Sequence, residues 1–317
     1  MNQALRSTEI LKRFTLITGK GGVGKSTLAA VLALVSAKRG HKTLVCELNT
    51  HERVSRLLGH EPAGSSIKKL EDNLWSVNIN PSEAMQEYGL MKLKFRAFYR
   101  LVFENPLVGA LVRFIPGIND LLMLGKAFNH EREVDQNGQP VWDRIIIDAP
   151  ATGHSLTFFT LPKVIMNAVP SGNMHRESHD MWSLLADPAR CGIHLVSLPE
   201  ELPIQETMEL FSALTEDIQL PVSTVFLNQV PAPAIPRHLS DDFDQWVDAP
   251  SDEVIKPLWD AGKLRQQHVN DSNRFLKKLE RLDCPVICLP MQYGIDFGRR
   301  EIDALAQTID EAITTRD

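Results

Sequence analysis

Short apolar runs alternate with helical segments along most of the chain. The apolar runs are rich in aliphatic side chains and are bounded by glycine, proline or polar residues, which is typical of buried strands. We expect strands in the run that begins at Phe14 and at residues 43–46, 74–79, 144–148, 193–197, 222–227 and 285–289. Strands that alternate with helices predict an α/β fold with a doubly wound, mostly parallel sheet. We expect a single domain, residues 1–317, that carries an insertion.

One part of the chain departs from this alternation. From about residue 82 to 133 the large apolar residues follow helical spacing, and Pro106, Pro116 and Gly117 divide the segment into three predicted helices. We expect these helices, together with residues 156–190, to form an inserted helical subdomain. Two interpretations of its apolar faces stay open: a groove for a hydrophobic helix, or ordinary packing against the sheet or a second subunit.

The first predicted strand runs into a glycine-rich turn and then into a helix of small and aliphatic residues. Gly19, Gly24, Lys25 and Ser26 fit the phosphate-binding pattern GxxxxGK[ST]. Glycines let successive backbone N–H groups curl around an anion, Lys25 can reach the terminal phosphates, and the Ser26 hydroxyl can bind Mg²⁺. The sequence therefore predicts ATP or ADP with Mg²⁺ as cofactors. The predicted nucleotide-binding residues of this loop are Gly19, Lys20, Gly21, Gly22, Val23, Gly24, Lys25, Ser26 and Thr27.

Composition narrows the range of functions. A formal net charge of −6 argues against a nucleic-acid-binding protein. No apolar run reaches about eighteen residues, and residues 1–14 lack an apolar signal core, so we expect a cytoplasmic protein without a transmembrane segment. The four cysteines are too few and too scattered for a disulfide scaffold, and we interpret them as small buried side chains.

A second lysine, Lys20, directly follows the first glycine of the loop. A lysine at this position resembles the deviant P-loop ATPases, which include nitrogenase reductases, Min/Par positioning ATPases and the ArsA-type group with the tail-anchored-protein targeting ATPases. In these families the extra lysine reaches the nucleotide of the other subunit across a dimer interface. The resemblance implies that the chain forms a homodimer and that Lys20 is catalytic.

Residues 148–154, DAPATGH, and the following SLTFFTLP closely resemble the switch II segment of the ArsA-type ATPases. Min and Par relatives do not carry this Thr-Gly-His with the following leucine-proline. The resemblance implies that Asp148 holds the water shell of Mg²⁺, with Ser26 as the second residue of the metal site.

Three further features agree with the ArsA-type pattern. Residues 199–207 are similar to the PExxxxxET stretch of the family, which implies that Glu200 contacts nucleotide across the dimer. Asn228 is similar to the asparagine that pairs with the adenine edge, and Pro290 opens a segment similar to the loop that closes over adenine. The resemblance covers about residues 14–313 as a single copy, without the CxxC pair that holds zinc in some targeting ATPases.

Switch I departs from the family pattern. The family reads Thr-Asp-Pro-Ala-His, with an aspartate that activates the attacking water, and that position is Asn49 here. An amide can orient a water molecule although it cannot accept a proton. We expect slow hydrolysis in which Asn49 orients water while Glu47 or Asp148 organises metal and water; loss of hydrolysis is the alternative.

Three functions are compatible with these features. The first, which we expect, is a homodimeric ATP-hydrolysing switch that handles an apolar client such as a membrane-protein helix. The second is the energising ATPase of an anion or arsenite exporter, which the lack of cysteine between Cys46 and Cys191 disfavours. The third is a Min/Par-like positioning ATPase, which needs a basic amphipathic tail, whereas residues 296–317 hold six acidic and three basic side chains.

Overall fold

The computed structural model describes residues 10–48, 51–81, 118–149, 155–168, 170–233, 253, 255–294 and 296–314. Three predictions fall outside these ranges: the role of Asn49, the helices expected in residues 82–117, and residues 150–154 of the DAPATGH segment. The inserted helical subdomain and its bounds therefore stay predictions.

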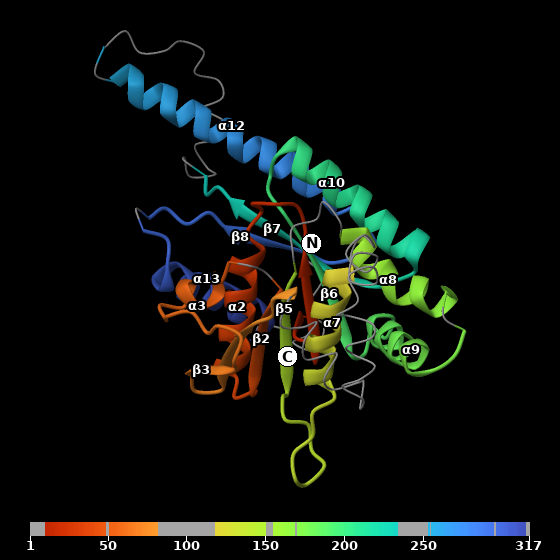
Figure 1. Ribbon diagram of the computed structural model, residues 1–317. Coiled ribbons are helices and arrows are strands. Elements are labelled where there is room, and N and C mark those ends of the chain that lie inside the picture. The colour runs from red at the N-terminus through yellow and green to blue at the C-terminus, as the bar shows by residue number, and fades with distance from the viewer. Residues whose placement is uncertain are drawn as a thin grey trace, which may run out of the picture.

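The described strands form one eight-stranded sheet in the order β3-β4-β2-β5-β1-β6-β7-β8 (Figure 1). Their bounds are β1 (Phe14–Thr18), β2 (Thr43–Glu47), β3 (Lys68–Glu71), β4 (Leu74–Asn78), β5 (Arg144–Asp148), β6 (Cys191–Ser197), β7 (Val222–Val230) and β8 (Val286–Pro290). Neighbouring strands are parallel except β3 and β4. From β1 near the centre the chain winds outward to both edges, which confirms the predicted doubly wound, mostly parallel α/β fold.

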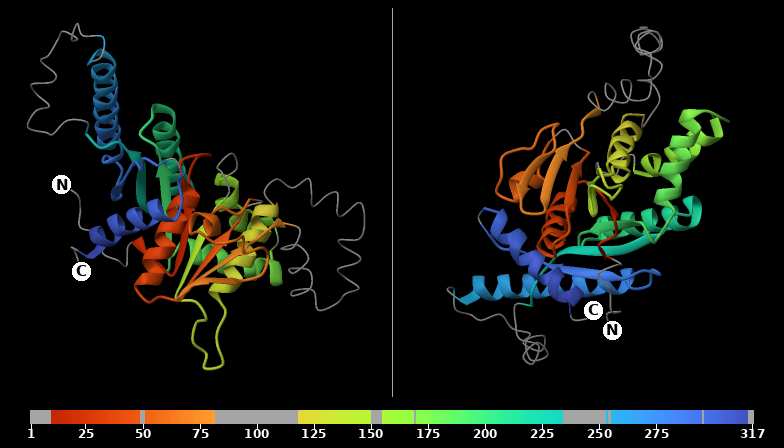
Figure 2. Two further views of the ribbon diagram at one scale, coloured as in Figure 1. Left: turned by 90° about the vertical axis from the view of Figure 1, so that its left-hand side faces the viewer. Right: turned by 90° about the horizontal axis from the view of Figure 1, so that it is seen from below.

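Helices cover both faces of the sheet (Figures 1 and 2). The faces carry separate apolar clusters: α2 and α13 pack on one, and α7, α8, α9 and α10 on the other. The described helices are α2 (Lys25–Lys38), α3 (Val54–Leu57), α7 (Ile118–Glu131), α8 (Ser155–Ala168), α9 (Asn173–Leu185), α10 (Glu201–Ser212), the π-helical turn η2 (Ala213–Ile218), α12 (Ile255–Leu279) and α13 (Arg299–Thr314).

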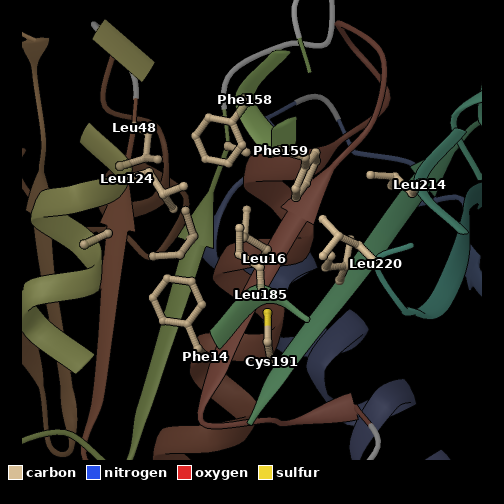
Figure 3. Packing of buried hydrophobic residues seen from close by; sticks show 14 of the residues in the cluster. Phe14, Leu16, Leu48, Leu124, Phe158, Phe159, Leu185, Cys191, Leu214 and Leu220 are labelled. Carbon is tan, nitrogen blue, oxygen red and sulfur yellow. The ribbon is translucent and has the colours of Figure 1, made fainter. Parts of the chain in front are cut away.

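The central strands are apolar on both sides because both sides are covered. Leu16 of β1 belongs to the cluster under α7 and α8, while its neighbour Ile17 belongs to the cluster under α2, since successive strand residues point to opposite faces. Figure 3 shows Leu16 among Leu124 of α7 and Phe159 of α8. At least these parts of the predicted insertion pack against the sheet.

The apolar pattern does not predict β3. Its four residues are mostly charged and it lies at the edge of the sheet, where it pairs antiparallel with β4. Asn73, between the two strands, has a φ of 60°, a left-handed conformation that asparagine adopts more readily than most residues. Charged side chains on an edge strand oppose pairing with other chains, so the pattern of a buried strand is missing there.

The long helix α12 extends away from the sheet past α10 (Figures 1 and 2). Its buried residues, Val269, Ser272, Phe275 and Leu279, all lie in its C-terminal half, where it packs on α10 and β7. Among the described helices, none combines the length and the apolar character that a membrane crossing requires.

Candidate functional site

The carboxyl ends of β1, β2 and β5 meet at one edge of the sheet, and there the glycine-rich loop joins β1 to α2. Gly19 has a φ of 147° and Gly24 a φ of 99°, backbone conformations that favour glycine. A Cβ at Gly19 would meet the carbonyl oxygen of Val196, and one at Gly24 would meet the side-chain amide of Asn228. These two glycines therefore allow the loop to lie close to β6 and β7.

An open cavity of about 700 Å³ lies beside this loop, a size in the range of small-molecule sites. Its walls are the loop with the first turn of α2, the segment after β2, the ends of β7 and β8, and the start of α13. The lining residues are Gly21, Gly22, Gly24, Lys25, Ser26, Thr27, His51, Glu52, Arg53, Arg56, Leu57, Asn228, Gln229, Pro290, Met291, Gln292, Phe297 and Leu305. Residues predicted to bind nucleotide that do not line it are Gly19, Lys20, Val23 and Glu200.

Lys25 begins α2 and turns its buried side chain back onto the loop. Its Nζ donates to the carbonyl oxygens of Gly19 at 3.0 Å and Lys20 at 2.8 Å. Burial lowers the pKa of Lys25, and the opposing charge of Asp148 raises it. Among the described residues the ammonium has only these neutral carbonyls as hydrogen-bond partners, which an anion at the cavity wall could replace.

Asp148 ends β5 beside Ser26 and is 1% exposed. The Ser26 hydroxyl donates to Asp148 Oδ2 at 2.6 Å, while Oδ1 is buried without a hydrogen-bond partner among the described residues. Burial raises the pKa of Asp148 to about 6, against the lowering effects of Ser26 and Lys25. A hydroxyl and an open carboxylate oxygen are hard ligands, so the two residues suit Mg²⁺, directly or through water.

Glu47 ends β2 in register with Asp148 and is fully buried. Its Oε1 accepts the backbone N–H groups of Arg53 at 2.7 Å and Val54 at 2.9 Å, and its Oε2 has no partner among the described residues. Burial raises the pKa of Glu47 to about 7, and the two backbone hydrogen bonds oppose that shift. Glu47 therefore holds the segment that follows β2 against the sheet, a contact that the sequence pattern does not indicate.

Lys20 does not face the cavity of its own chain. Its Nζ lies 2.6 Å from Glu206 Oε1 on α10, and both side chains are about one-third exposed. Glu200, which immediately precedes α10, is exposed and lies outside the cavity lining. The two residues predicted to act across subunits therefore do not line the cavity of their own chain.

The far end of the cavity combines an amide with apolar groups. Asn228, 4% exposed, donates from Nδ2 to the carbonyl oxygen of Val23 at 2.9 Å and so ties β7 to the loop. Pro290 ends β8, and Met291 and Phe297 follow it along the lining. Such a surface suits the flat face of a purine ring.

Cationic side chains on the cavity wall were not predicted from the sequence. Arg53 and Arg56 line the cavity from the segment that follows β2, together with His51. The available signal was their place in the chain, because residues directly after a parallel strand lie at the ligand-binding edge of the sheet. The glycine-rich motif itself does not include this segment.

The sequence of this chain is similar to those of known ATPases. The sequence model of the anion-transporting ATPase family matches residues 12–171. The ATPase BagA of Mycobacterium tuberculosis is 30% identical over 306 residues, covering 90% of this chain and 89% of BagA. A putative arsenical pump-driving ATPase of Halobacterium salinarum is 25% identical over 68% of this chain and 35% of its own length. ATPase ASNA1 homolog 2 of Paramecium tetraurelia is 28% identical over 48% of this chain and 45% of its own length. The chain therefore belongs to the anion-transporting ATPase family.

Proposed function

We propose that this protein is a homodimeric, ATP-hydrolysing switch in the cytoplasm that couples its nucleotide state to an apolar client such as a membrane-protein helix. One observation carries the nucleotide part: Ser26 lines the cavity beside Lys25 and donates at 2.6 Å to Asp148, whose buried Oδ1 has no partner among the described residues. A glycine-rich loop, a lysine and a carboxylate in this arrangement have the chemistry to bind Mg²⁺ and ATP.

Each polar side chain has a separate task in this proposal. Lys25 exchanges the carbonyl oxygens of Gly19 and Lys20 for phosphate oxygens. Ser26 and Asp148 hold Mg²⁺, which when bound offsets the negative charge of the phosphates. Asn49 orients the attacking water, and because an amide is a poor proton acceptor, hydrolysis is slow.

Exposed apolar side chains lie on α8, the helix that follows the strand of Asp148 in the chain, and on α10. β5 ends at Asp148 and α8 begins at Ser155. On α8 the side chains of Leu156 and Val164 are 42% and 55% exposed, and on α10 Leu202 is 58% exposed. A change in what Asp148 binds would therefore act on α8, and these side chains are candidates for client contact.

In this proposal the dimer depends on Lys20. In a single chain its ammonium pairs with Glu206, and because both side chains are partly exposed, the pair contributes little stability. Lys20 can therefore leave Glu206 for the phosphates bound by a second subunit, and Glu200 immediately precedes the helix that carries Glu206. This exchange makes dimer formation depend on nucleotide.

The named activity of the arsenical relative defines the second candidate, an energising ATPase for a metalloid exporter. Metalloid binding through sulfur requires thiolates. Cys46 and Cys191 lie in β2 and β6, and burial raises the pKa of both, that of Cys191 to about 12. Burial also raises the pKa of Cys284 and of Cys288 to about 11. These thiols are poor candidates for As(III) ligands.

The test measures Mg²⁺-dependent ATP affinity, hydrolysis and sedimentation for the native protein, Lys25→Ala and Lys20→Ala. Lys38→Ala is the matched control, because Lys38 is an exposed lysine in the last turn of the same helix and pairs with Asp303. We expect Lys25→Ala to lose ATP affinity by about 100-fold, since a buried cation at the phosphates is removed. Lys20→Ala should bind ATP but fail to dimerise, and Lys38→Ala should behave as the native protein.

A crosslinkable apolar helix peptide, added with ATP or ADP, tests the client. We expect capture that differs between the two nucleotides. Native protein that binds ATP no better than Lys25→Ala would contradict the nucleotide proposal. Hydrolysis stimulated by As(III) or Sb(III), without capture of any apolar peptide, would favour the exporter ATPase instead.

A further inference from the structure

The cavity wall formed by the segment after β2 carries two arginines beside the carboxylate of Glu52. Arg53 and Arg56 line it, and both side chains are exposed. Neither guanidinium makes a hydrogen bond or an ion pair with a described residue. An arginine that faces a ligand cavity without a carboxylate partner is free to bind an anion there.

The backbone of Arg53 is fixed relative to the metal site. Its N–H group donates to Glu47 Oε1 at 2.7 Å, and the N–H of Val54 donates to the same oxygen at 2.9 Å. Glu47 is fully buried at the end of β2 and is paired in register with Asp148 on β5. Arg53 is therefore anchored to the same sheet edge as Asp148.

The charge of Arg53 acts on the residues of the loop and the metal site. Burial is the largest cause of the lowered pKa of Lys25, and Arg53 lowers it further. Arg53 also opposes the rise that burial causes in the pKa of Asp148. The adjacent carboxylate of Glu52 is directed to the backbone instead, since its Oε1 accepts the N–H of Gly64 at 2.8 Å.

We propose that Arg53 is a catalytic residue that contacts the terminal phosphate of ATP within its own subunit. This inference rests on the proposed ATP-hydrolysing function and names a further residue of that same site. In the reaction, water adds to the terminal phosphorus and the bond to the bridging oxygen breaks with its electron pair going to ADP, while the proton of the water passes to phosphate or solvent. The planar guanidinium donates two hydrogen bonds to the phosphoryl oxygens as negative charge shifts during this step.

Arg56 provides a contrast within the same wall. It lies in α3, three positions further along, and is not among the charges that shift the pKa of Lys25 or Asp148. We expect Arg56 to add general positive potential to the cavity without contacting the terminal phosphate. Its substitution removes the same charge from the same wall and serves as the control.

The experiment compares Arg53→Ala, Arg53→Lys and Arg56→Ala with the native protein. ATP and ADP affinities are measured separately with Mg²⁺, and hydrolysis is measured as a single turnover at saturating ATP. We expect Arg53→Ala to lower ATP affinity about tenfold, to leave ADP affinity within about twofold, and to slow the single turnover about 100-fold. Arg53→Lys should recover ATP affinity but not the rate. Arg56→Ala should weaken ATP and ADP alike, by less than about threefold.

The outcomes separate this inference from the function on which it rests. If the native protein hydrolyses ATP and Arg53→Ala matches its rate, Arg53 has no catalytic role. Equal loss of ATP and ADP affinity in Arg53→Ala would also overturn the inference, because the contact would not be with the terminal phosphate. If the native protein binds neither nucleotide, the proposed function itself fails. Thermal unfolding of Arg53→Ala should match that of the native protein, because the removed side chain has no described partner.

Discussion

Two buried acidic sites lie at opposite edges of the sheet, one at the amino ends and one at the carboxyl ends of the strands. They differ in how their carboxylates are paired. At the amino ends of β1 and β6, Glu131 is 5% exposed and its Oε1 lies 2.8 Å from Arg190 and 3.4 Å from Arg13. At the carboxyl ends of β2 and β5, Glu47 and Asp148 are buried more deeply, and each keeps one oxygen without a described partner. At the first site the carboxylate is paired with arginines of its own chain. At the second site, which we call the open edge, one oxygen of each carboxylate has no partner among the described residues.

The difference separates a structural site from a ligand site. A buried carboxylate oxygen that lacks a partner lowers stability, and a bound metal ion or ligand can supply that partner. Arg13 and Arg190 pair with the Glu131 carboxylate and supply its opposite charge, so this acid is neutralised by its own chain. At the other edge the nearest cations, Lys25 and Arg53, line the cavity instead of closing on the acids.

Asp148→Asn should give the largest effect. We expect hydrolysis to fall by about 10²–10³-fold, because an amide is a much weaker Mg²⁺ ligand than a carboxylate. The free energy of unfolding without nucleotide should stay the same or rise, because a carboxylate that burial penalises is replaced by a neutral group. Single-turnover hydrolysis and urea unfolding measure the two quantities. A large loss of stability would show that the open acid is structural after all.

Glu131→Ala should lower stability and leave nucleotide binding unchanged, the reverse of Asp148→Asn. It leaves Arg13 and Arg190 without their shared carboxylate, and we expect a loss of about 3 kcal/mol in the free energy of unfolding, because Glu131 is buried. ATP affinity should not change. Glu201→Ala is the control, since Glu201 pairs with Lys278 on the surface, and its loss should be too small to resolve in urea unfolding. Weakened ATP binding in Glu131→Ala would contradict the assignment of Glu131 to a purely structural site.

A pH profile tests a third buried polar group, away from both acidic sites. His194 in β6 is fully buried, its Nε2 donates to the carbonyl oxygen of Ile10 at 2.9 Å, and burial lowers its pKa from 6.5 to about 4. The unfolded chain binds this proton below pH 6.5 and the folded chain does not. The contribution of neutral His194 to the free energy of unfolding is therefore fully present above pH 6.5 and falls as the pH decreases towards 4. Between pH 7.5 and 5 the loss should be about 2 kcal/mol. His194→Gln should remove that part of the pH dependence, and an unchanged profile would mean that the pKa of His194 is the same in the folded and unfolded chains.

Glu206→Gln should give the smallest effect on stability. The Lys20–Glu206 pair is partly exposed, so the free energy of unfolding should change by less than about 1 kcal/mol. Because Lys20 is released, ATP-dependent dimerisation should occur at a lower protein concentration. Analytical ultracentrifugation across a concentration series measures this shift. Weaker dimerisation would mean that Glu206 contributes to the dimer interface rather than competing with the second subunit for Lys20.

Sequence reasoning predicted the parts of the molecule that local pattern determines. The buried parallel strands and the loop from Gly19 to Lys25 follow from apolar runs and glycine spacing, whereas the charged edge strand β3 has no such pattern. Side-chain partners distant in sequence were not predicted. Lys20 meets Glu206 only because α10 packs beside β6, and Arg53 reaches the cavity because buried Glu47 binds its backbone. These contacts depend on how the elements pack, which periodicity does not specify.

Hydrogen–deuterium exchange with and without Mg²⁺ and a non-hydrolysable ATP analogue tests the contrast between the two edges most directly. We expect nucleotide to slow exchange in residues 19–27, around Asn228 and around Arg53, and to leave peptides containing Glu131 and Arg190 unchanged. Lys25→Ala, carried through the same experiment, should show no protection. Protection at the Glu131 edge, or none around residues 19–27 at saturating nucleotide, would contradict the assignment of the open edge as the nucleotide site.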